Sequence, residues 1–473
     1  MLDDPALQRR RVLPRQRHPS AGAHSTFRSV GALGAIVSGG SICPAAPRWS
    51  RILVEHSPDQ PPNLSEEAGT QAHPPTIGVR ATDHFIGRRD LRGTRASLRR
   101  GLVPSLAAVE VPLAAPPLAR VLTLGCVQPP NRVEQEELTA AFRQLWAARH
   151  FNADRVEQLH QAVQVGARHL ALPLAEYPKL DSFAKANDAF IEHATRLGEQ
   201  AIRLALDRAG LSPKRVDHLF FVTVTGIATP SIEARLINRL GMRADTKRTP
   251  LFGLGCVAGA AALSRAADYL RAYPGEVAVL LSVELCSLTL QREDVSVANL
   301  IASGLFGDGA VAVVLGGTEL GSESGGSAQG PRVLATRSVF YPDTEWAMGW
   351  DVVDTGFKVV LSAKVPDLAR EHLRGDVDGF LESQGLTRRD IAHWVCHPGG
   401  PKVLEAVEQA LELPRRATER SWSSLRRVGN LSSASVLFIF QDLLASGEAR
   451  PGDRGLLLSM GPGFCSELVL LEW

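Results

Sequence analysis

The stretch that decides the fold is LFGLGCVAGA, residues 251–260, where an apolar run ends at Gly255 and a thiol, Cys256, precedes small residues leading into AALSRAADYL. The pattern predicts a strand, a glycine turn and a helix. A free cysteine is among the most buried residue types, so Cys256 could simply be packed in the core. A thiol at a helix N-terminus would instead feel the positive end of the helix dipole, which lowers its pKa and makes it a nucleophile. The rest of the chain decides between these two interpretations.

Composition is that of a soluble globular protein. The chain has 473 residues, enough for two to four domains, with 44% apolar and 22% charged residues. None of its six cysteines form a CxxC pair, and six cysteines in so long a chain do not make a disulfide framework. We therefore expect a reducing, cytoplasmic setting. No apolar run reaches the roughly 18 residues of a membrane span, so no integral membrane segment is expected.

Residues 1–118 differ from the remainder. They are rich in Arg, Pro, Gly, Ser and Ala and lack a long amphipathic pattern, which predicts a disordered extension. Asp3 and Asp4 stand where a signal peptide needs positive charge, which disfavours a secretory signal peptide in this segment. The Arg clusters could contact nucleic acid or form a solvated tail, and a start codon assigned too far upstream would also explain them. Acidic residues outnumber basic ones from 119 onward, which disfavours a nucleic-acid binder.

The body of the chain contains a repeat. LDRAGLSPKRVDHLF (206–220) aligns with LESQGLTRRDIAHWV (381–395) at an offset of 175 residues, and each predicts a helix end, a glycine stop and a strand. At almost the same offset Cys256 aligns with Asn430, and each is expected to open a helix. We therefore predict two similar α/β halves, residues 119–317 and 331–473, whose equivalent helix starts face one pocket.

His397 is the candidate partner of the thiol. It follows a predicted strand in IAHWVCHPGGPKVLEAV and precedes a Pro-Gly-Gly turn, and ligand sites gather at the carboxyl ends of such strands. A turn histidine without a role is the alternative. His393, Cys396 and His397 also resemble metal ligands, but only His393 and His397 would share a face of the strand, so no metal is expected.

Together these residues resemble the chalcone synthase-like type III polyketide synthases of the thiolase superfamily. The resemblance covers roughly 119–473 and rests on LFGLGCVAGA, GLFGDGA (304–310), HPGGPKVLEAVEQAL (397–411), GNLSSASVLFI (429–439) and MGPGF (460–464). It implies a duplicated, five-layered αβαβα fold, a homodimer, and a catalytic Cys256, His397 and Asn430. It also implies direct use of acyl-CoA and malonyl-CoA, with no metal or redox cofactor.

The resemblance implies the following mechanism. Cys256 takes the starter acyl group, His397 and Asn430 stabilise the charge formed as malonyl-CoA decarboxylates, and the carbanion attacks the Cys256 thioester. Cycles of extension precede ring closure.

The resemblance also implies a set of substrate-binding residues, and several depart from the plant pattern. They are Phe306 at the gate between the CoA tunnel and the acyl cavity, Val359 for a second gate Phe, Trp350 for a small Gly, Thr225 beside Val224, Thr229 at the dimer contact, the loop residues Gly461, Pro462 and Gly463, and Arg155 for the CoA phosphates, with Arg168 as an alternative. This pattern is more similar to bacterial alkylresorcinol or alkylpyrone synthases, which favours a fatty acyl-CoA starter.

Three other readings compete with this one. An initiating ketoacyl-carrier-protein synthase shares Cys, His and Asn, but HPGGP and MGPGF favour the polyketide branch. A non-catalytic scaffold has no need for a thiol at a helix start. A cysteine protease would not be expected to carry the duplicated sheet.

Overall fold

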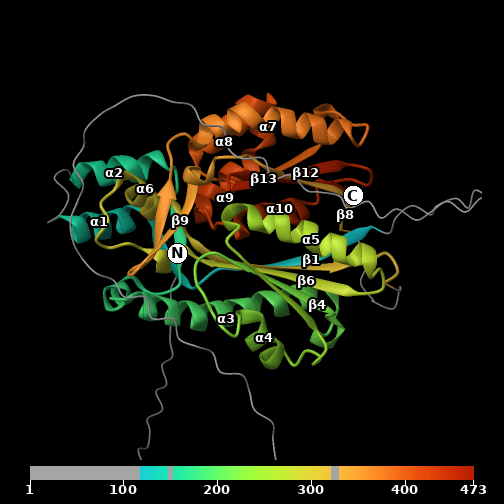
Figure 1. The fold of residues 1–473 in the computed structure, drawn as a ribbon, viewed down its shortest axis with the longest axis horizontal. Helices are drawn as coiled ribbons and strands as arrows, with labels where there is room; N and C mark the ends of the chain where they lie inside the picture. The colour runs from blue at the N-terminus through green and yellow to red at the C-terminus, as the bar shows by residue number, and fades with distance from the viewer. Residues whose placement is uncertain (1–117, 148–152, 321–329) are drawn as a thin grey trace, which may run out of the picture. The chain divides into compact units, whose positions relative to one another are not determined.

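The computed structural model describes residues 118–147, 153–320 and 330–473 (Figure 1). Residues 1–117 of the predicted extension lie outside the described residues, so its predicted disorder stays a prediction. The described residues from 118 onward belong to one compact unit. The fold class predicted from the sequence, a layered α/β arrangement, is confirmed.

Within the described residues, the main sheet has nine strands. In spatial order they are β11 (His393–Cys396), β12 (Arg454–Gly461), β13 (Cys465–Glu472), β8 (Arg332–Phe340), β1 (Ala119–Val127), β7 (Asp308–Gly316), β6 (Val277–Leu285), β4 (His218–Thr223) and β5 (Lys247–Phe252). Two further pairs stand apart, β2 (Asn131–Glu134) with β3 (Ala167–Leu170), and β9 (Met348–Val353) with β10 (Gly356–Leu361). Every residue of β6 and β7 is buried, which explains their continuous apolar sequences.

Ten α-helices are described. They are α1 (Gln135–Trp146), α2 (Ala153–Ala162), α3 (Phe183–Ala209), α4 (Ile232–Leu240), α5 (Ala258–Ala272), α6 (Val297–Leu305), α7 (Val365–Glu382), α8 (Pro401–Leu411), α9 (Glu419–Val428) and α10 (Ala434–Ser446). Figure 1 shows helices on three levels, with α7 and α8 above the sheet, α5 and α10 between its two halves, and α3 and α4 below, while α1, α2 and α6 lie to one side. The layers alternate αβαβα.

The two halves of the sheet share one pairing scheme. In the first, β4 is parallel to β6, which is antiparallel to β7, and β7 is antiparallel to β1. In the second, β11 is parallel to β12, followed by antiparallel β13 and β8. The halves meet where β1 pairs with β8. The strand β5 extends the first half alone.

The predicted repeat also appears in the helix ends. Gly210, with φ +66°, ends α3, and Gly385, with φ +69°, follows α7. In each case the next leucine donates its N–H to a carbonyl five residues back, from Leu211 to Leu206 at 3.0 Å and from Leu386 to Leu381 at 2.9 Å. Both turns need a left-handed residue, which glycine supplies without steric cost. The boundaries predicted at 317 and 331 for the halves stay predictions.

The central helices approach each other closely. A Cβ on Gly259 of α5 would lie 2.2 Å from the carbonyl oxygen of Ser433, just before α10. Helix α10 is apolar on nearly all sides, as expected for a helix covered by other elements. This contact holds the starts of α5 and α10, and hence the residues before them, side by side.

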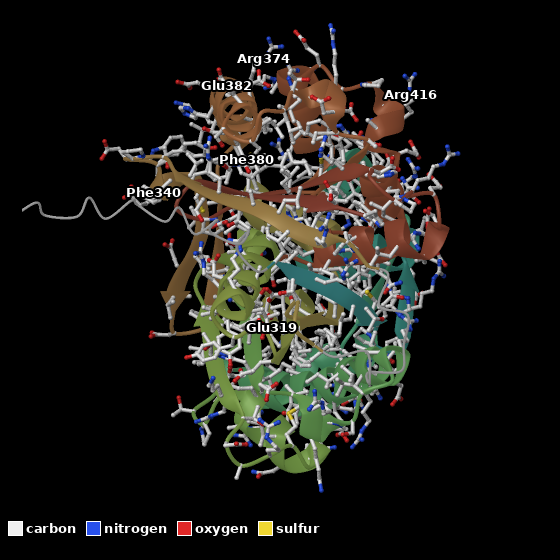
Figure 2. The ribbon with its side chains drawn as sticks, turned by 90° about the vertical axis from the view of Figure 1, so that its right-hand side faces the viewer. Glu319, Phe340, Arg374, Phe380, Glu382 and Arg416 are labelled. Atoms are coloured by element: carbon white, nitrogen blue, oxygen red, sulfur yellow. The ribbon has the colours of Figure 1, made fainter. Side chains whose placement is uncertain are left out.

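The outer layers separate apolar from charged faces. Figure 2 shows Phe380 of α7 directed inward, while Arg374 and Glu382 lie on the outer side of the same helix. Phe380 is 1% exposed, whereas Phe340 at the end of β8 is 59% exposed. The buried face of α7 thus packs on the second half of the sheet.

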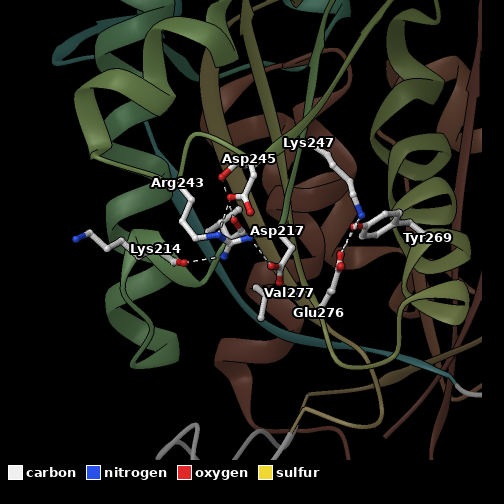
Figure 3. Close-up of polar contacts among 10 residues, drawn as sticks. Lys214, Asp217, Arg243, Asp245, Lys247, Tyr269, Glu276 and Val277 are labelled. Carbon is white, nitrogen blue, oxygen red and sulfur yellow. Dashed lines mark hydrogen bonds and ion pairs between the residues drawn. The ribbon is translucent and has the colours of Figure 1, made fainter.

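Ion pairs and hydrogen bonds of charged residues connect the amino-terminal ends of the parallel strands β4, β5 and β6 (Figure 3). Arg243 donates to Asp217 at 2.7 Å and to Asp245 at 2.8 Å, and the other oxygen of Asp217 accepts the N–H of Val277 at 2.8 Å. Lys247 Nζ lies 2.7 Å from the Tyr269 hydroxyl. These charged groups lie at the opposite end of the strands from the carboxyl ends of β4 and β6. Ligand sites of α/β sheets commonly lie at the carboxyl ends of the strands.

No helix in the described part of the chain is both long and apolar enough to cross a membrane.

Candidate active site

Cys256 lies in a short 3₁₀ turn, Gly255–Val257, between β5 and α5. Gly255 has φ +55°, and a Cβ on it would lie 2.8 Å from Pro462. Glycine is therefore needed for both the backbone conformation and the close approach. The predicted strand, glycine and helix are present, but α5 begins two residues after Cys256, at Ala258.

His397 directly follows β11, as predicted. Its N–H donates to Leu458 O at 2.9 Å, which extends the pairing of β11 with β12. The Pro-Gly-Gly turn then begins α8 at Pro401. The side chain is 5% exposed, and neither ring nitrogen has a hydrogen-bond partner among the described residues. A buried imidazole without partners is available for a ligand.

Asn430 lies in a tight turn before α10, which begins four residues later, at Ala434. Its Oδ1 accepts the N–H of Ser432 at 2.8 Å and the hydroxyl of Ser435 at 3.3 Å. Both bonds use the amide oxygen. The amide nitrogen is thereby oriented away from the turn as a donor.

Cys256, His397 and Asn430 line one cavity of about 60 Å³, although they come from β-strand and helix junctions far apart in the sequence. Cys256 Sγ lies 3.8 Å from Ser432 Oγ. His397 and Asn430 are buried, while Cys256 keeps intermediate exposure. The pseudo-symmetry thus brings the two predicted helix starts to one pocket, with His397 beside them.

Desolvation shifts the pKa of both Cys256 and His397 in this pocket. It raises the pKa of the Cys256 thiol to about 12, with hydrogen bonds to Ser432 and Asn430 acting in the opposite direction and the Glu284 charge raising it further. Burial lowers the pKa of His397 to about 3. Desolvation therefore favours the neutral thiol and the neutral imidazole. The sequence-based expectation of a lowered thiol pKa differs because the dipole argument omits this desolvation.

A second, larger cavity adjoins the first. It has a volume of about 420 Å³ and reaches α1, where its walls are mainly apolar. Cys286, Phe306, Trp350 and Val359 line both cavities. Trp350 on β9 lies directly opposite Val359 on β10. The two predicted gate positions, Phe306 and Val359, and the predicted cavity residue Trp350 therefore stand where the cavities meet.

The late loop packs against the thiol turn. A Cβ on Gly461 would lie 2.7 Å from Val257 N, and Gly463 has φ +141°. Pro462 lines the small cavity. Of the three predicted loop residues, Gly461 and Pro462 thus lie against the turn that carries Cys256, whereas Gly463 lies near Phe340 and Cys465.

Other predicted substrate residues lie apart from both cavities. Thr225 is buried and donates to Glu284 Oε2 at 3.0 Å, while its neighbour Val224 lines the small cavity. Thr229 is exposed and lines a separate hollow of about 770 Å³ beside β5. Arg155 is exposed on α2.

The suggested phosphate role of Arg168 is wrong. Its side chain is 1% exposed and donates to the carbonyls of Ser303 at 2.8 Å, Gly304 at 2.6 Å and Phe306 at 2.9 Å. Arg168 also donates to Gln135 Oε1, so its guanidinium is held at the C-terminal end of α6 by these protein acceptors.

Glu284 was missed by sequence reasoning. This fully buried carboxyl accepts hydrogen bonds from Val224 N at 3.1 Å, from Thr225 Oγ1 at 3.0 Å and from Ser433 Oγ. Burial raises its pKa to about 7. The available signal was a single acid inside the mostly apolar stretch VAVLLSVEL (277–285). Glu284 links the turn after β4 to the start of α10, beneath Cys256.

Among the described residues, no group of three or more His, Cys, Asp or Glu side chains is arranged to hold a metal ion. Of the three residues considered from the sequence, His393 contacts Asp453 Oδ2 at 3.0 Å, and Cys396 is buried in the core.

Two family models match the sequence: the N-terminal domain of chalcone and stilbene synthases over residues 109–319, and the C-terminal domain over 332–472. The chain belongs to the chalcone and stilbene synthase family. It is a type III polyketide synthase, a CoA-dependent acyltransferase with a thiolase-like fold.

Several similar chains are bacterial. The 1,3,6,8-tetrahydroxynaphthalene synthase of Streptomyces peucetius subsp. caesius is 51% identical over 345 residues, which is 73% of this chain and 90% of that protein. A putative chalcone synthase of Bacillus subtilis (strain 168) is 37% identical over 75% of this chain and 99% of its own length. The crystal structure of 1,3,6,8-tetrahydroxynaphthalene synthase from Streptomyces coelicolor A3(2) superposes with a TM-score of 0.70 at 31% identity, covering 75% of this chain and 99% of that one.

Proposed function

We propose that this type III polyketide synthase uses malonyl-CoA as starter and extender and builds a polyhydroxylated naphthalene. The proposal is supported by the likeness to the Streptomyces peucetius synthase, which is named for a ten-carbon aromatic skeleton. Five two-carbon units supply ten skeletal carbons. The observation that carries the chemistry is that Cys256, His397 and Asn430 line one cavity.

Cys256 is the proposed nucleophile. Proton transfer from its thiol to His397 leaves the net charge of the pocket unchanged, so the attraction of the resulting pair offsets part of the cost of burying each charge. The thiolate attacks the acyl carbon of the CoA ester, and the CoA thiolate leaves.

His397 and Asn430 are the proposed oxyanion donors. When enzyme-bound malonyl-CoA loses CO2, negative charge develops on its thioester oxygen, and N–H donors fixed at that position lower the barrier. The enolate carbon then attacks the Cys256 thioester. Carbon–carbon bond formation by this route neither oxidises nor reduces the chain, so we propose that it uses no redox cofactor.

A fatty acyl-CoA starter giving an alkylresorcinol or alkylpyrone is the second candidate. One observation favours it: the cavity of about 420 Å³ beside the site is lined mainly by apolar side chains, including Leu138, Phe142 and Leu145 of α1. Such walls would hold an alkyl chain by excluding water.

Intact-mass measurement tests both candidates. The protein is incubated separately with malonyl-CoA, acetyl-CoA and palmitoyl-CoA, and Cys256→Ser is compared with Cys126→Ser, which removes another free thiol on β1. We expect an acyl adduct from malonyl-CoA in the wild type and in Cys126→Ser but not in Cys256→Ser. An adduct from palmitoyl-CoA alone would select the fatty acyl candidate. If no CoA ester loads, or Cys256→Ser still loads, the proposed nucleophile is wrong.

We also propose a homodimer formed over β5. This strand is at one end of the sheet, and the apolar side chains beside it are exposed, with Phe252 at 52% and Ile227 at 45%. An exposed apolar sheet edge favours pairing with another chain. Light scattering should give twice the chain mass, and Phe252→Asp should shift it toward the monomer.

A further inference from the structure

A chain of hydroxyl groups in the wall of the larger cavity ends at a buried carboxyl. The Tyr177 hydroxyl lies 2.6 Å from Ser287 Oγ, and Ser287 Oγ donates to Asp308 Oδ2 at 2.5 Å. Tyr177 and Ser287 line the larger cavity. Ser287 follows Cys286, which lines both cavities. The hydroxyl chain therefore begins close to where a growing acyl chain would leave the Cys256 pocket.

Asp308 is held as a proton acceptor. Its side chain is fully buried and also accepts the N–H groups of Ser287 at 2.8 Å and Ala171 at 2.6 Å. Burial raises its pKa to about 6, while these hydrogen bonds and the charge of Arg168 lower it. Both protonation states are accessible near neutral pH, which is what a general acid or base requires.

Other polar side chains on the same cavity wall donate their hydrogen bonds to backbone carbonyls instead of to a chain of hydroxyl groups. Thr289 and Asn299 donate to backbone carbonyls. Ser303 also donates to a carbonyl, and it lies 3.1 Å from His160 Nε2. Burial lowers the pKa of His160 to about 4, so this imidazole is a weak base. Of these groups, Tyr177 has the path to a carboxyl.

We propose that Tyr177, Ser287 and Asp308 form a proton relay that catalyses ring closure of the polyketide in the larger cavity. Tyr177 is the catalytic residue, and Ser287 and Asp308 act through it. This inference rests on the proposed function, because it needs a poly-β-keto chain attached to Cys256.

The proposed step balances without an oxidant or reductant. A C–H bond of a methylene between two carbonyls breaks, its electron pair forms the enolate, and its proton joins the Tyr177 oxygen. The phenolic proton moves to Ser287, whose hydroxyl proton moves to the Asp308 carboxylate. The enolate carbon bonds to a distant ketone carbon, and the proton returns by the same path to the new alkoxide.

Two variants break the relay at different atoms. Tyr177→Phe removes the first hydroxyl, and Ser287→Ala removes the connection to Asp308, while Ser287→Thr keeps a hydroxyl there. Tyr341→Phe is the matched control, because it removes another tyrosine hydroxyl that donates to a carboxylate, Asp376, at 2.5 Å. Tyr341 lines neither cavity.

Each variant receives malonyl-CoA, and two quantities are measured: the rate of CoA release and the ratio of ring-closed aromatic to open-chain or pyrone products. General acid–base catalysis contributes at least about 100-fold to a rate. We therefore expect Tyr177→Phe and Ser287→Ala to lower the product ratio at least about tenfold with CoA release within about twofold of wild type. Tyr341→Phe and Ser287→Thr should keep the wild-type ratio.

The outcomes separate the two proposals. If the wild type releases no CoA from malonyl-CoA, the proposed function fails, and the relay fails with it. If the wild type is active and Tyr177→Phe keeps the wild-type ratio, only the relay is overturned. A fall in CoA release with an unchanged ratio, or the same change in Tyr341→Phe, also overturns the relay, since either indicates a structural effect.

Discussion

Phe306 and Asn430 are joined by a parallel backbone bridge. Asn430 donates its N–H to Leu305 O at 2.9 Å, and its carbonyl accepts the N–H of Gly307 at 3.0 Å. The residue at the junction of the two cavities and the predicted oxyanion donor are thus fixed relative to each other by main-chain bonds. A shift of one must move the other.

Replacement of Gly429 should break this bridge. Gly429 has φ +74° and ψ −165°, a region that is essentially limited to glycine, and a Cβ there would lie 2.6 Å from Leu305 O. We expect Gly429→Ala to lower the free energy of unfolding by about 3 kcal/mol, measured by urea denaturation, and to reduce CoA release. Gly447→Ala is the control: it has φ +64° with no atom near the new Cβ, so it should cost only about 1 kcal/mol. Equal losses in the two variants would contradict the clash with the bridge.

Contact between the central helices gives a second prediction. A Cβ on Gly259 would lie 2.2 Å from Ser433 O, which is backbone and cannot rotate away. Gly259→Ala should therefore destabilise the fold by about 3 kcal/mol or more, measured by thermal unfolding. Gly375→Ala on α7, where no atom lies within 4 Å of the new Cβ, should instead stabilise by about 0.5–1 kcal/mol. A tolerated Gly259→Ala would mean that the helices can separate.

The Asn430 amide should increase the rate at which malonyl-CoA loses CO2. Removal of one oxyanion donor costs roughly 100-fold or more in rate, so Asn430→Ala should slow CO2 release from malonyl-CoA by about that factor. Ser435→Ala removes the 3.3 Å bond to Asn430 Oδ1 and the acceptor of Leu431 N–H at 2.6 Å, but it leaves the Asn430 amide nitrogen in place, so the rate should fall by less than about tenfold. An unchanged rate in Asn430→Ala would exclude the oxyanion role.

Glu284 should make stability fall as pH rises. Burial raises its pKa in the folded protein from 4.5 to about 7, so between these values the folded state binds more protons than the unfolded state. Stability from this group is complete below the unfolded pKa and is lost as pH rises through the folded one. Between pH 5 and 8 the free energy of unfolding should fall by about 2 kcal/mol more in the wild type than in Glu284→Gln. Parallel urea curves for the two proteins at both pH values would refute this assignment.

Local sequence patterns were sufficient to predict that Cys256, His397 and Asn430 would line one cavity. The glycine before Cys256, the strand before His397 and the repeat ending at Asn430 each depend on a few adjacent residues and on one symmetry. The direction of Thr225 was not predictable in the same way, because its hydroxyl is taken by Glu284, which lies 59 residues later in the chain. Arg168 likewise resembles a phosphate ligand in the sequence, yet it is buried against carbonyls of α6.

The ionisation of Cys256 could not be obtained from position alone. The helix start is visible in the sequence, whereas the desolvation that raises the thiol pKa depends on walls contributed by both halves. Sequence patterns therefore located the groups, and packing determined their charges.

The hairpin of β9 and β10 has a consequence for how such proteins diversify. Trp350 and Val359 shape the junction of the cavities, yet they stand on a two-stranded ribbon that is not part of the nine-stranded sheet. Mutations there can alter which molecule fits without disturbing the elements that hold the thiol, the imidazole and the amide. Lineages descended from such an ancestor can therefore acquire new products by small changes in one ribbon, while selection preserves the reaction centre.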